Sequence, residues 1–256
     1  MSKYKISIIM PNYNGELFLD RAIKAFLNST WDNKELIIVD GKSSDSSHSI
    51  ISSYLHDNEC ITWIKESDKG ISDAINMGIK SASGDIIGYL GSDDLLLKNT
   101  LEIVADNYAL VGFDAVYFDS YTHDYKNNLT NYRSCPDLSF TKYNLLKYGT
   151  IVGLQNIYFN AEVLKDYSYC TSNKYSMDYE LYFRVLDKYN HFLHVREPSS
   201  VNIAHNNISS VLSVQQRKEA FIVAKKNVTN FMSFKSLYLN KRFFIDFIKN
   251  SYHKLK

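Results

Sequence analysis

The chain has few cysteines and no long apolar run. Its cysteines, Cys60, Cys135 and Cys170, are odd in number, lie far apart in the 256 residues and lack metal-ligand spacing. This predicts free thiols in a reducing compartment. No apolar stretch approaches the length of a membrane-spanning helix, and the N-terminus leads straight into a strand pattern instead of a signal peptide. We therefore expect a cytoplasmic protein without a membrane span.

Two glycine-rich phosphate-binding motifs are also absent. The sequence has neither the dinucleotide pattern G-x-G-x-x-G nor the phosphate-loop pattern G-x-x-x-x-G-K-[ST]. This argues against a hydride-transfer enzyme and against a phosphate-loop kinase. If the protein binds a phosphorylated ligand, we expect a metal ion, not a glycine nest, to meet the negative charge.

Apolar strands and amphipathic helices alternate along the first half of the chain. Strands are predicted at 4–10, 35–39, 61–65 and 86–90, and helices at 16–27, 47–55 and 71–81. The alternation predicts an α/β protein with a mostly parallel central sheet, flanked by crossover helices. The second half is less regular, with strands expected at 115–120, 151–159 and within 191–201, and a hairpin or loop at 121–134.

Polar side chains follow each predicted strand of the first half. They are Tyr13, Asp40, Asp68 and the adjacent pair Asp93 and Asp94. Ligands of open parallel sheets bind just outside the carboxyl ends of the strands, and Mg²⁺ is held by one or two carboxylates with phosphates and water. These residues therefore predict a site for a metal and a diphosphate. The alternative is that Ser92, Asp93 and Asp94 merely form a turn that caps a helix beginning near residue 95.

Two helices carry further candidates. Asp73, Asn76 and Lys80 lie on one polar face of the helix at 71–81, where short side chains near its start suit a base or ribose edge; for Lys80 a solvated face is the alternative. Asp178 lies in the first turn of a helix that opens near residue 175, where the helix dipole favours a carboxylate. A plain helix-start carboxylate is the competing interpretation.

Several segments, taken together, resemble the motifs of one family. They are Ile8–Asn14 (IIMPNYN), Ile38–Asp45 (IVDGKSSD), Glu66–Gly78 (ESDKGISDAINMG) and Gly84–Asp94 (GDIIGYLGSDD). Over about residues 4–212 the chain resembles the inverting glycosyltransferases of family 2, in a branch that builds bacterial polysaccharides. The resemblance implies the Rossmann-like GT-A fold, with a donor half at 1–112, an acceptor half at 113–212 and a C-terminal extension at 213–256.

The resemblance also implies roles for individual residues. Asp40 corresponds to the nucleobase contact, Asp93 to the ribose contact and Asp94 to the ligand of Mn²⁺ or Mg²⁺. Asp178 corresponds to the catalytic base. The remaining nucleotide-sugar candidates in the matched segments are Pro11, Tyr13, Asn14, Lys42, Asp68, Asp73 and Asn76. His205 is a candidate second metal ligand, with a structural histidine as the alternative.

The chain departs from the family pattern at two places. Leu154 stands where a His-Gln pair has its histidine, and Asn206 and Asn207 stand where a loop usually has two glycines. These departures affect the expected acceptor fit, because the loop's backbone path depends on its glycines.

The resemblance implies transfer of a sugar from a nucleoside-diphosphate donor to a hydroxyl of a growing, lipid-linked surface glycan. Two alternatives stay open: a nucleotidyltransferase that makes the activated sugar, and a non-catalytic sugar-binding protein of the same fold. The segment after the first strand (PNYNGELF) lacks the glycine-rich, basic loop expected of the nucleotidyltransferase.

The C-terminal extension is basic. Residues 225–256 contain eight Lys or Arg and one acidic residue, and an apolar stripe runs through 235–256. This pattern is typical of a helix that lies in a membrane interface, so we expect peripheral attachment to the inner face of the cell membrane. The alternatives are packing on the protein's own core or on a second copy of the chain.

Overall fold

One mixed sheet runs through the part of the chain that the computed structural model describes, residues 3–205 and 213–228. Its strand order is β3-β2-β1-β4-β8-β6-β9-β5, with β7 attached to β6. The strands are β1 (Ile6–Asn12), β2 (Lys34–Asp40), β3 (Ile61–Lys65), β4 (Ile86–Tyr89), β5 (Leu95–Leu96), β6 (Ala115–Asp124), β7 (Leu129–Arg133), β8 (Ile157–Asn160) and β9 (Phe192–Ala204).

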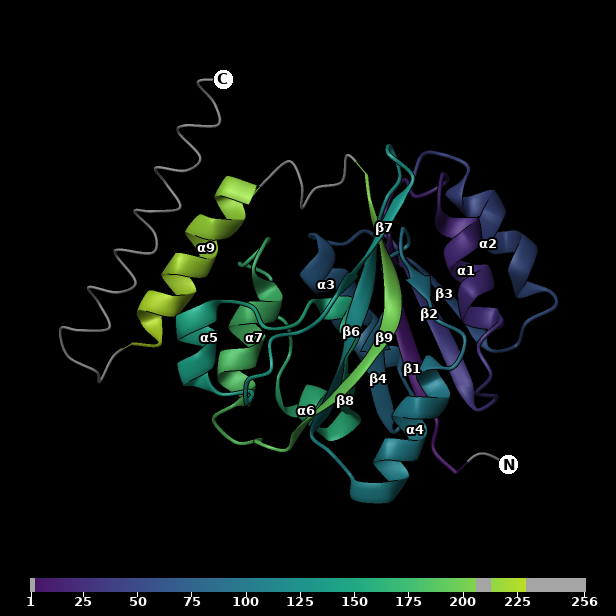
Figure 1. Cartoon of the computed structure of the whole chain (residues 1–256). Helices are drawn as coiled ribbons and strands as arrows, with labels where there is room; N and C mark the ends of the chain where they lie inside the picture. The colour runs from purple at the N-terminus through teal and green to yellow at the C-terminus, as the bar shows by residue number, and fades with distance from the viewer. Residues whose placement is uncertain (1–2, 206–212, 229–256) are drawn as a thin grey trace.

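The helices cover both faces of this sheet (Figure 1). They are α1 (Leu19–Leu27), α2 (Ser47–Leu55), α3 (Ile71–Ser81), α4 (Thr100–Val111), α5 (Lys142–Tyr148), α6 (Ala161–Asp166), α7 (Met177–Val185) and α9 (Ser213–Lys226), with a 3₁₀ turn at Leu154–Asn156. Side chains of a strand point alternately to the two faces. Ile8 and Ile38 therefore join the core under α1, α2 and α4, whereas Ile9 and Ile37 join the core under α3, α5, α6, α7 and α9.

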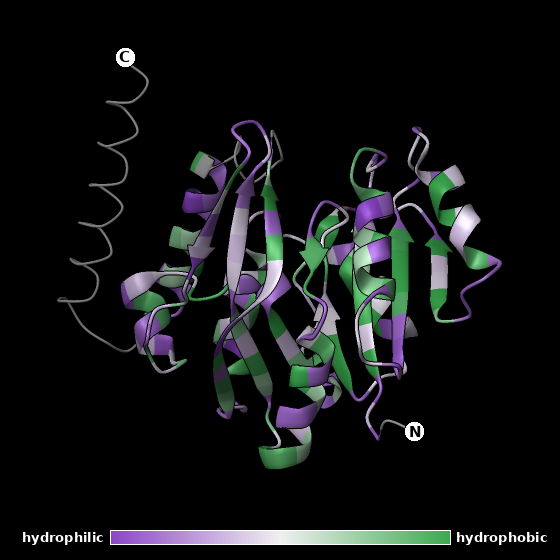
Figure 2. Cartoon of the chain, turned by 45° about the vertical axis from the view of Figure 1, so that its right-hand side comes forward, coloured by the Kyte–Doolittle hydropathy of each residue, from purple (hydrophilic) through white to green (hydrophobic). Residues whose placement is uncertain are grey.

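The first four strands of the alternating pattern are parallel, as predicted. β1 pairs with β2 and β4, and β2 pairs with β3, all in parallel. β1, β2 and β4 are buried along most of their length, as is typical of strands covered on both faces, whereas β3 buries only Ile61. The apolar runs of these strands appear green in Figure 2. In the register of β1 and β2, Asn12 lies beside Asp40. The carboxyl ends of these strands therefore meet at one edge.

The second half of the sheet reverses direction at β8. This strand is antiparallel to both β4 and β6, so β6 and its parallel neighbour β9 again run in the direction of β4. The short strand β5 pairs with β9 through Leu95 and Val201. This pairing brings the segment after Asp94 against the end of β9.

Some predicted boundaries are wrong. The helix expected near residue 95 begins at Thr100 after Asn99, because Leu95 and Leu96 pair with β9. The segment 92–94 therefore does not cap it. The strand expected at 151–159 covers only β8, because the Asn156 N–H bonds back to the Gly153 carbonyl and forms a turn. The hairpin in the polar segment at 121–134 is confirmed as β6 and β7.

The C-terminal extension is described only in its first part. Helix α9 packs on the same core as α7 through Val223 and Ala224. The predicted stripe at 235–256 and the Asn206–Asn207 loop lie outside the described residues. Within 3–205 and 213–228, no helix is both long enough and apolar enough to cross a membrane.

Candidate active site

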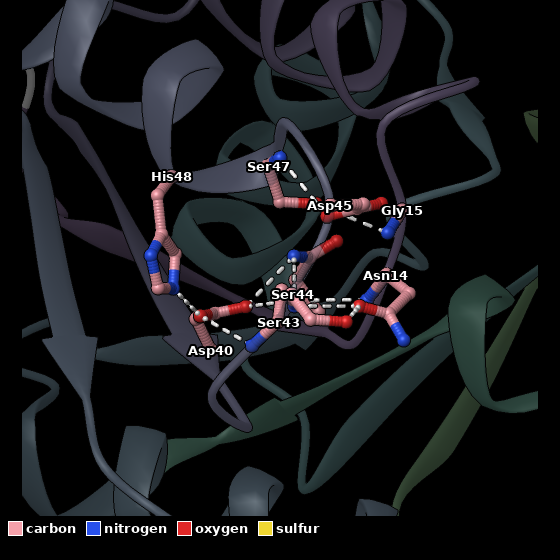
Figure 3. Close-up of polar contacts among 9 residues, drawn as sticks. Asn14, Gly15, Asp40, Ser43, Ser44, Asp45, Ser47 and His48 are labelled. Carbon is pink, nitrogen blue, oxygen red and sulfur yellow. Dashed lines mark hydrogen bonds and ion pairs between the residues drawn. The ribbon is translucent and has the colours of Figure 1, made fainter.

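The loops that follow β1 and β2 are joined by side-chain hydrogen bonds (Figure 3). The Asn14 N–H donates to Ser43 Oγ at 2.8 Å, and the Ser44 N–H donates to Asn14 Oδ1 at 2.8 Å. Asn14 adopts a left-handed φ of 51°, which asparagine tolerates better than most residues. Asn14, which was predicted to bind the nucleotide sugar, therefore holds the two loops together.

A second set of bonds extends this junction toward α2. The Glu16 N–H donates to Asp45 Oδ2 at 2.9 Å, and the Ser46 N–H donates to Glu16 Oε2 at 2.9 Å. The Gly15 N–H donates to Ser47 Oγ at 3.1 Å. The polar turn residues of the sequence thus satisfy backbone groups of the neighbouring loop.

Asp40 lies at the centre of this junction and is fully buried. Its Oδ1 accepts from Asn12 Nδ2 at 2.9 Å, and its Oδ2 lies 2.7 Å from His48 Nε2 and accepts from the Ser43 N–H at 3.2 Å. Both carboxylate oxygens are therefore engaged within the protein, and a nucleobase contact by Asp40 stays a prediction. Beside it, Asn12 Oδ1 is buried without a hydrogen-bond donor.

Tyr13 and Asp68 meet above Gly41. A Cβ placed on Gly41 would lie 2.5 Å from Asp68 Oδ2 and 3.5 Å from Tyr13 Cδ2, so a larger residue here would displace the Asp68 carboxylate. Tyr13 is 70% exposed, which leaves its ring accessible. Lys42 is exposed beside them with φ 61°, and Pro11 is half-buried within β1.

Two residues of α3 that were predicted to bind the nucleotide sugar form hydrogen bonds with the protein's own backbone. Asp73 Oδ2 accepts from the Lys69 N–H at 3.0 Å and so braces the loop before α3. The Asn76 amide bonds the Tyr169 backbone in both directions, each at 2.8 Å. Asn76 therefore positions the Tyr169 backbone, and a contact of Asn76 with the nucleotide sugar stays a prediction.

Asp93 and Asp94 fold around Gly91 at the end of β4. A Cβ on Gly91 would lie 2.8 Å from an oxygen of each carboxylate. Asp94 is buried, and its Oδ1 accepts from the Ile203 N–H at 3.1 Å. Asp93 Oδ2 lies 2.8 Å from His205 Nε2. The end of β9 thus contacts Asp94, and the residue that follows β9 contacts Asp93.

The chemistry of this pair suits a divalent cation. Burial and the neighbouring charge of Asp93 raise the pKa of Asp94 to about 7, so two ionised carboxylates here are costly without a positive charge nearby. Carboxylate oxygens are the ligands that Mg²⁺ and Mn²⁺ prefer. The His205 ring packs on the Phe18 ring, with centroids 4.7 Å apart, and its Nε2 contacts Asp93. That Asp94 and His205 bind a metal ion stays a prediction.

Asp178 lies in the first turn of α7, as predicted. Burial raises the pKa of its carboxyl to about 6. The hydrogen bond that its Oδ1 accepts from the Tyr179 N–H at 2.7 Å lowers the pKa but does not offset the effect of burial. A carboxylate with a pKa near the working pH is suited to general base catalysis. Tyr169 and Tyr182 are close enough for the charge of Asp178 to raise the pKa of both hydroxyls, in addition to the effect of burial.

Tyr89, the last residue of β4, connects the two groups of carboxylates. Burial raises the pKa of its hydroxyl well above the usual value, and the charges of Asp94, Asp93 and Asp178 raise it further. Both the strand-end pair and the helix-start carboxylate therefore act on the same hydroxyl. Sequence reasoning missed Tyr89, although an aromatic residue four positions before Asp93 was the available signal.

The segment before Asp178 is held by α9. The Tyr175 N–H donates to Glu219 Oε2 at 2.7 Å and the Lys174 N–H donates to Glu219 Oε1 at 3.3 Å. The Ser176 hydroxyl donates to the Gln216 carbonyl at 2.9 Å. Glu219 lies more than 40 residues from its partners, and no local pattern marks it, so sequence reasoning missed this contact as well.

Asn173 ties the same segment to α3. The Ser72 hydroxyl donates to the Asn173 carbonyl at 3.2 Å, and the Asn173 side chain bonds the backbone of Ser176 in both directions at 3.1 Å. The start of α7 is therefore fixed by elements from both halves of the chain.

Known proteins resemble this chain in sequence. The family model described as glycosyl transferase family 2 matches residues 7–166, more than half of the chain. An uncharacterized glycosyltransferase of Haemophilus influenzae is 39% identical over 98 residues, which are 38% of this chain and 39% of the relative. The Escherichia coli enzyme named UDP-Glc:alpha-D-GlcNAc-diphosphoundecaprenol beta-1,3-glucosyltransferase WfgD is 37% identical over 103 residues, which are 40% of each protein. The chain thus spans about four tenths of the length of these two relatives.

Solved structures show the same fold at low sequence identity. TarS of S. aureus in complex with UDP-GlcNAc superposes with a TM-score of 0.72 and 15% identity, over 91% of this chain and 69% of that one. The mannosyltransferase PcManGT of Pyrobaculum calidifontis, in complex with GDP-Man and Mn²⁺, gives 0.68 and 16%, over 92% and 68%. The predicted GT-A fold is confirmed, and the chain belongs to glycosyl transferase family 2.

Proposed function

We propose that this protein transfers a sugar, with inversion, from a nucleoside-diphosphate donor to a hydroxyl of a growing glycan. The observation that carries the proposal is the Asp93–Asp94 pair at Gly91, which the Ile203 N–H and His205 contact, in a chain that matches the family model over residues 7–166 and has Asp178 in the first turn of α7. Such a transfer needs a cation, held by carboxylates, on the leaving-group side and a base on the acceptor side. These two requirements correspond to the two groups of carboxylates.

On the donor side, Asp94 would hold Mn²⁺ or Mg²⁺ together with the diphosphate, with His205 as a second candidate ligand. When bound, the ion would supply positive charge to the departing nucleoside diphosphate. Asp93 would contact the ribose. The accessible ring of Tyr13, the buried acceptor Asn12 Oδ1 and the carboxylate of Asp68 support a nucleoside site beside them.

On the acceptor side, Asp178 would take the proton of the attacking hydroxyl. The hydroxyl oxygen forms the new bond to the anomeric carbon as the bond to the diphosphate breaks, and the electron pair of that bond leaves with the phosphate oxygen. Attack from the face opposite to the leaving group inverts the anomeric centre. The raised pKa of Asp178 keeps the carboxylate basic enough for this proton transfer near neutral pH.

For the acceptor we propose a lipid-linked surface glycan at the inner face of the cell membrane. The E. coli relative is named for a diphosphoundecaprenol-linked acceptor, and a Bacillus subtilis relative is named as a minor teichoic acid biosynthesis protein. The basic, apolar-striped sequence at 235–256 would attach the protein to anionic lipid. Liposome flotation with anionic lipid tests this attachment by comparing the full chain with a chain that ends at Met232. Equal flotation of the two chains would reject it. Analytical sedimentation of the same two chains tests whether the segment instead pairs two copies of the protein.

The activity is tested by incubating the protein with UDP-, GDP- and dTDP-sugars and measuring the nucleotide released. We expect slow release of the nucleoside diphosphate from one donor, abolished by a chelator and restored by Mn²⁺. Pyrophosphate formation from a nucleoside triphosphate and a sugar phosphate would instead indicate a nucleotidyltransferase. Binding of a sugar nucleotide without turnover, with or without acceptor extract, would indicate a non-catalytic protein.

A further inference from the structure

A second group of ligand-bearing side chains lies away from the carboxylates at the strand ends. Among the described residues, Asp119, Cys135 and His194 are the one set of three or more His, Cys, Asp or Glu whose ligand atoms all lie within 4.8 Å of one another. They come from β6, from the segment after β7 and from β9. Along β9, His194 lies nine residues before Ile203, the partner of Asp94, a strand length of about 30 Å.

The distances within this group suit a tetrahedral metal. His194 Nε2 lies 3.0 Å from Asp119 Oδ1, close to the separation of about 3.3 Å expected for two ligands with bonds of about 2.0 Å to zinc. The Cys135 N–H donates to the same Asp119 oxygen at 2.7 Å, which keeps the thiol beside the carboxylate. Cys135 Sγ lies 3.2 Å from the Phe118 carbonyl. A small movement of these side chains would admit an ion among the three.

The surroundings fix the ligands in place. The Tyr132 hydroxyl donates to Asp119 Oδ2, and the ring of His194 stacks on Tyr117 with centroids 4.7 Å apart and planes 5° from parallel. Such outer contacts orient the ligands of metal sites. Asp119 is 3% exposed and the side chain of His194 is 14% exposed, so solvent competes little for these positions.

The ligand types separate this group from the strand-end pair. A thiolate, an imidazole and a carboxylate are typical zinc ligands, whereas sites made of oxygen alone favour magnesium or manganese. Three protein ligands leave a fourth position for water.

We propose that Asp119, Cys135 and His194 bind a zinc ion, independently of the transfer activity and of its metal. Zinc displaces the proton of the Cys135 thiol, which is released to solvent, and joins the segment after β7 to the sheet. This segment forms part of the wall of a cavity of about 530 Å³ lined by residues that include Asp137, Phe140 and Arg196. The ion would therefore stabilise one side of that cavity.

Cobalt(II) titration of the metal-free full-length protein tests the proposal, with excess Mg²⁺ present to occupy the oxygen site. We expect a thiolate-to-cobalt absorption band in the near ultraviolet and strong red-region bands of a tetrahedral ion, saturating at one cobalt per chain and reversed by zinc. Cys135→Ser should lose the ultraviolet band, and His194→Gln should weaken binding by at least about tenfold. Cys60→Ser and Cys170→Ser are the matched controls and should keep the cobalt bands of the unmodified protein.

Thermal unfolding gives an independent readout in case Cys135→Ser folds poorly. Zinc at micromolar concentration should raise the unfolding temperature of the unmodified protein by several degrees, and should not raise that of His194→Gln. Absence of the ultraviolet band in the unmodified protein, or its persistence in Cys135→Ser, would overturn the proposal. An equal zinc-dependent shift in the unmodified protein and His194→Gln would overturn it too.

Discussion

The donor-side loops and the base-bearing segment are held in place in different ways. The loops after β1 and β2 satisfy each other with their own short polar side chains, around the buried carboxylate of Asp40. The segment before Asp178 is held instead by Asn173, bonded from α3, and by Glu219 of α9. The donor side is therefore built from two adjacent turns, whereas the base is positioned by contacts that cross the whole chain. Variants on the two sides should consequently fail in different assays.

The largest effect is expected for Asp178→Asn. Loss of the general base should lower the turnover number by about 10²–10⁴-fold, while donor binding stays near its original affinity because the donor-side loops are untouched. Steady-state kinetics of sugar transfer and calorimetric titration with the nucleotide measure the two quantities. Asp106→Asn, an exposed carboxylate on α4, is the control, and near-normal transfer by Asp178→Asn would show that the base is elsewhere.

The complementary change, Asp94→Asn, should act on binding. We expect the affinity for the nucleoside diphosphate in the presence of Mn²⁺ to fall by about 10–100-fold, because a metal ligand is lost. Without Mn²⁺ the variant and the unmodified protein should bind equally. Calorimetry with and without Mn²⁺ measures the difference, and a metal-dependent gain of equal size in both proteins would contradict the assignment of Asp94.

Glu219→Ala tests whether α9 positions the base. Removing the acceptor of two backbone N–H groups should loosen the start of α7 and lower the turnover number by about tenfold, with the KM for the donor little changed. Lys218→Ala is the matched control, because it also introduces alanine on α9 and Lys218 is exposed. An effect of Glu219→Ala on donor KM alone, with normal turnover, would refute a positioning role.

The smallest effect concerns pH. Burial raises the pKa of Asp178 to about 6, and a base acts only when deprotonated, so turnover should be half-maximal near pH 6 and fall about tenfold for each further unit of acid. Measuring kcat between about pH 4.5 and pH 8, at saturating donor and acceptor, tests this because the range spans both the plateau and the acid limb. A profile that stays flat down to about pH 4.5 would show an ordinary carboxyl pKa and remove the support that burial gives to the base.

Sequence reasoning succeeded where the signal is local. The alternating strands and helices predicted the parallel half, and the polar residues after each strand predicted that Tyr13, Asp68 and their neighbours would meet at one edge. It failed where a distant partner decides the outcome. Residues 95 and 96 form a strand only because β9 pairs with them.

The same reason explains why Glu219 and the Asp119, Cys135 and His194 group escaped prediction. Each depends on elements that the fold brings together from separate parts of the chain, and none has a characteristic spacing. The role of Asp178 as the base, by contrast, stays a prediction that rests on a family motif, since its place in the first turn of a helix is also compatible with an ordinary helix-start carboxylate.

The most direct test of the common site is a crystal structure of the protein with Mn²⁺ and an unreactive analogue of the sugar donor that it binds. The account predicts the metal and diphosphate at Asp94, with the anomeric carbon within about 6 Å of the Asp178 carboxylate, room for one attacking hydroxyl between them. A diphosphate bound away from Asp94, or an anomeric carbon separated from Asp178 by another part of the protein, would contradict it.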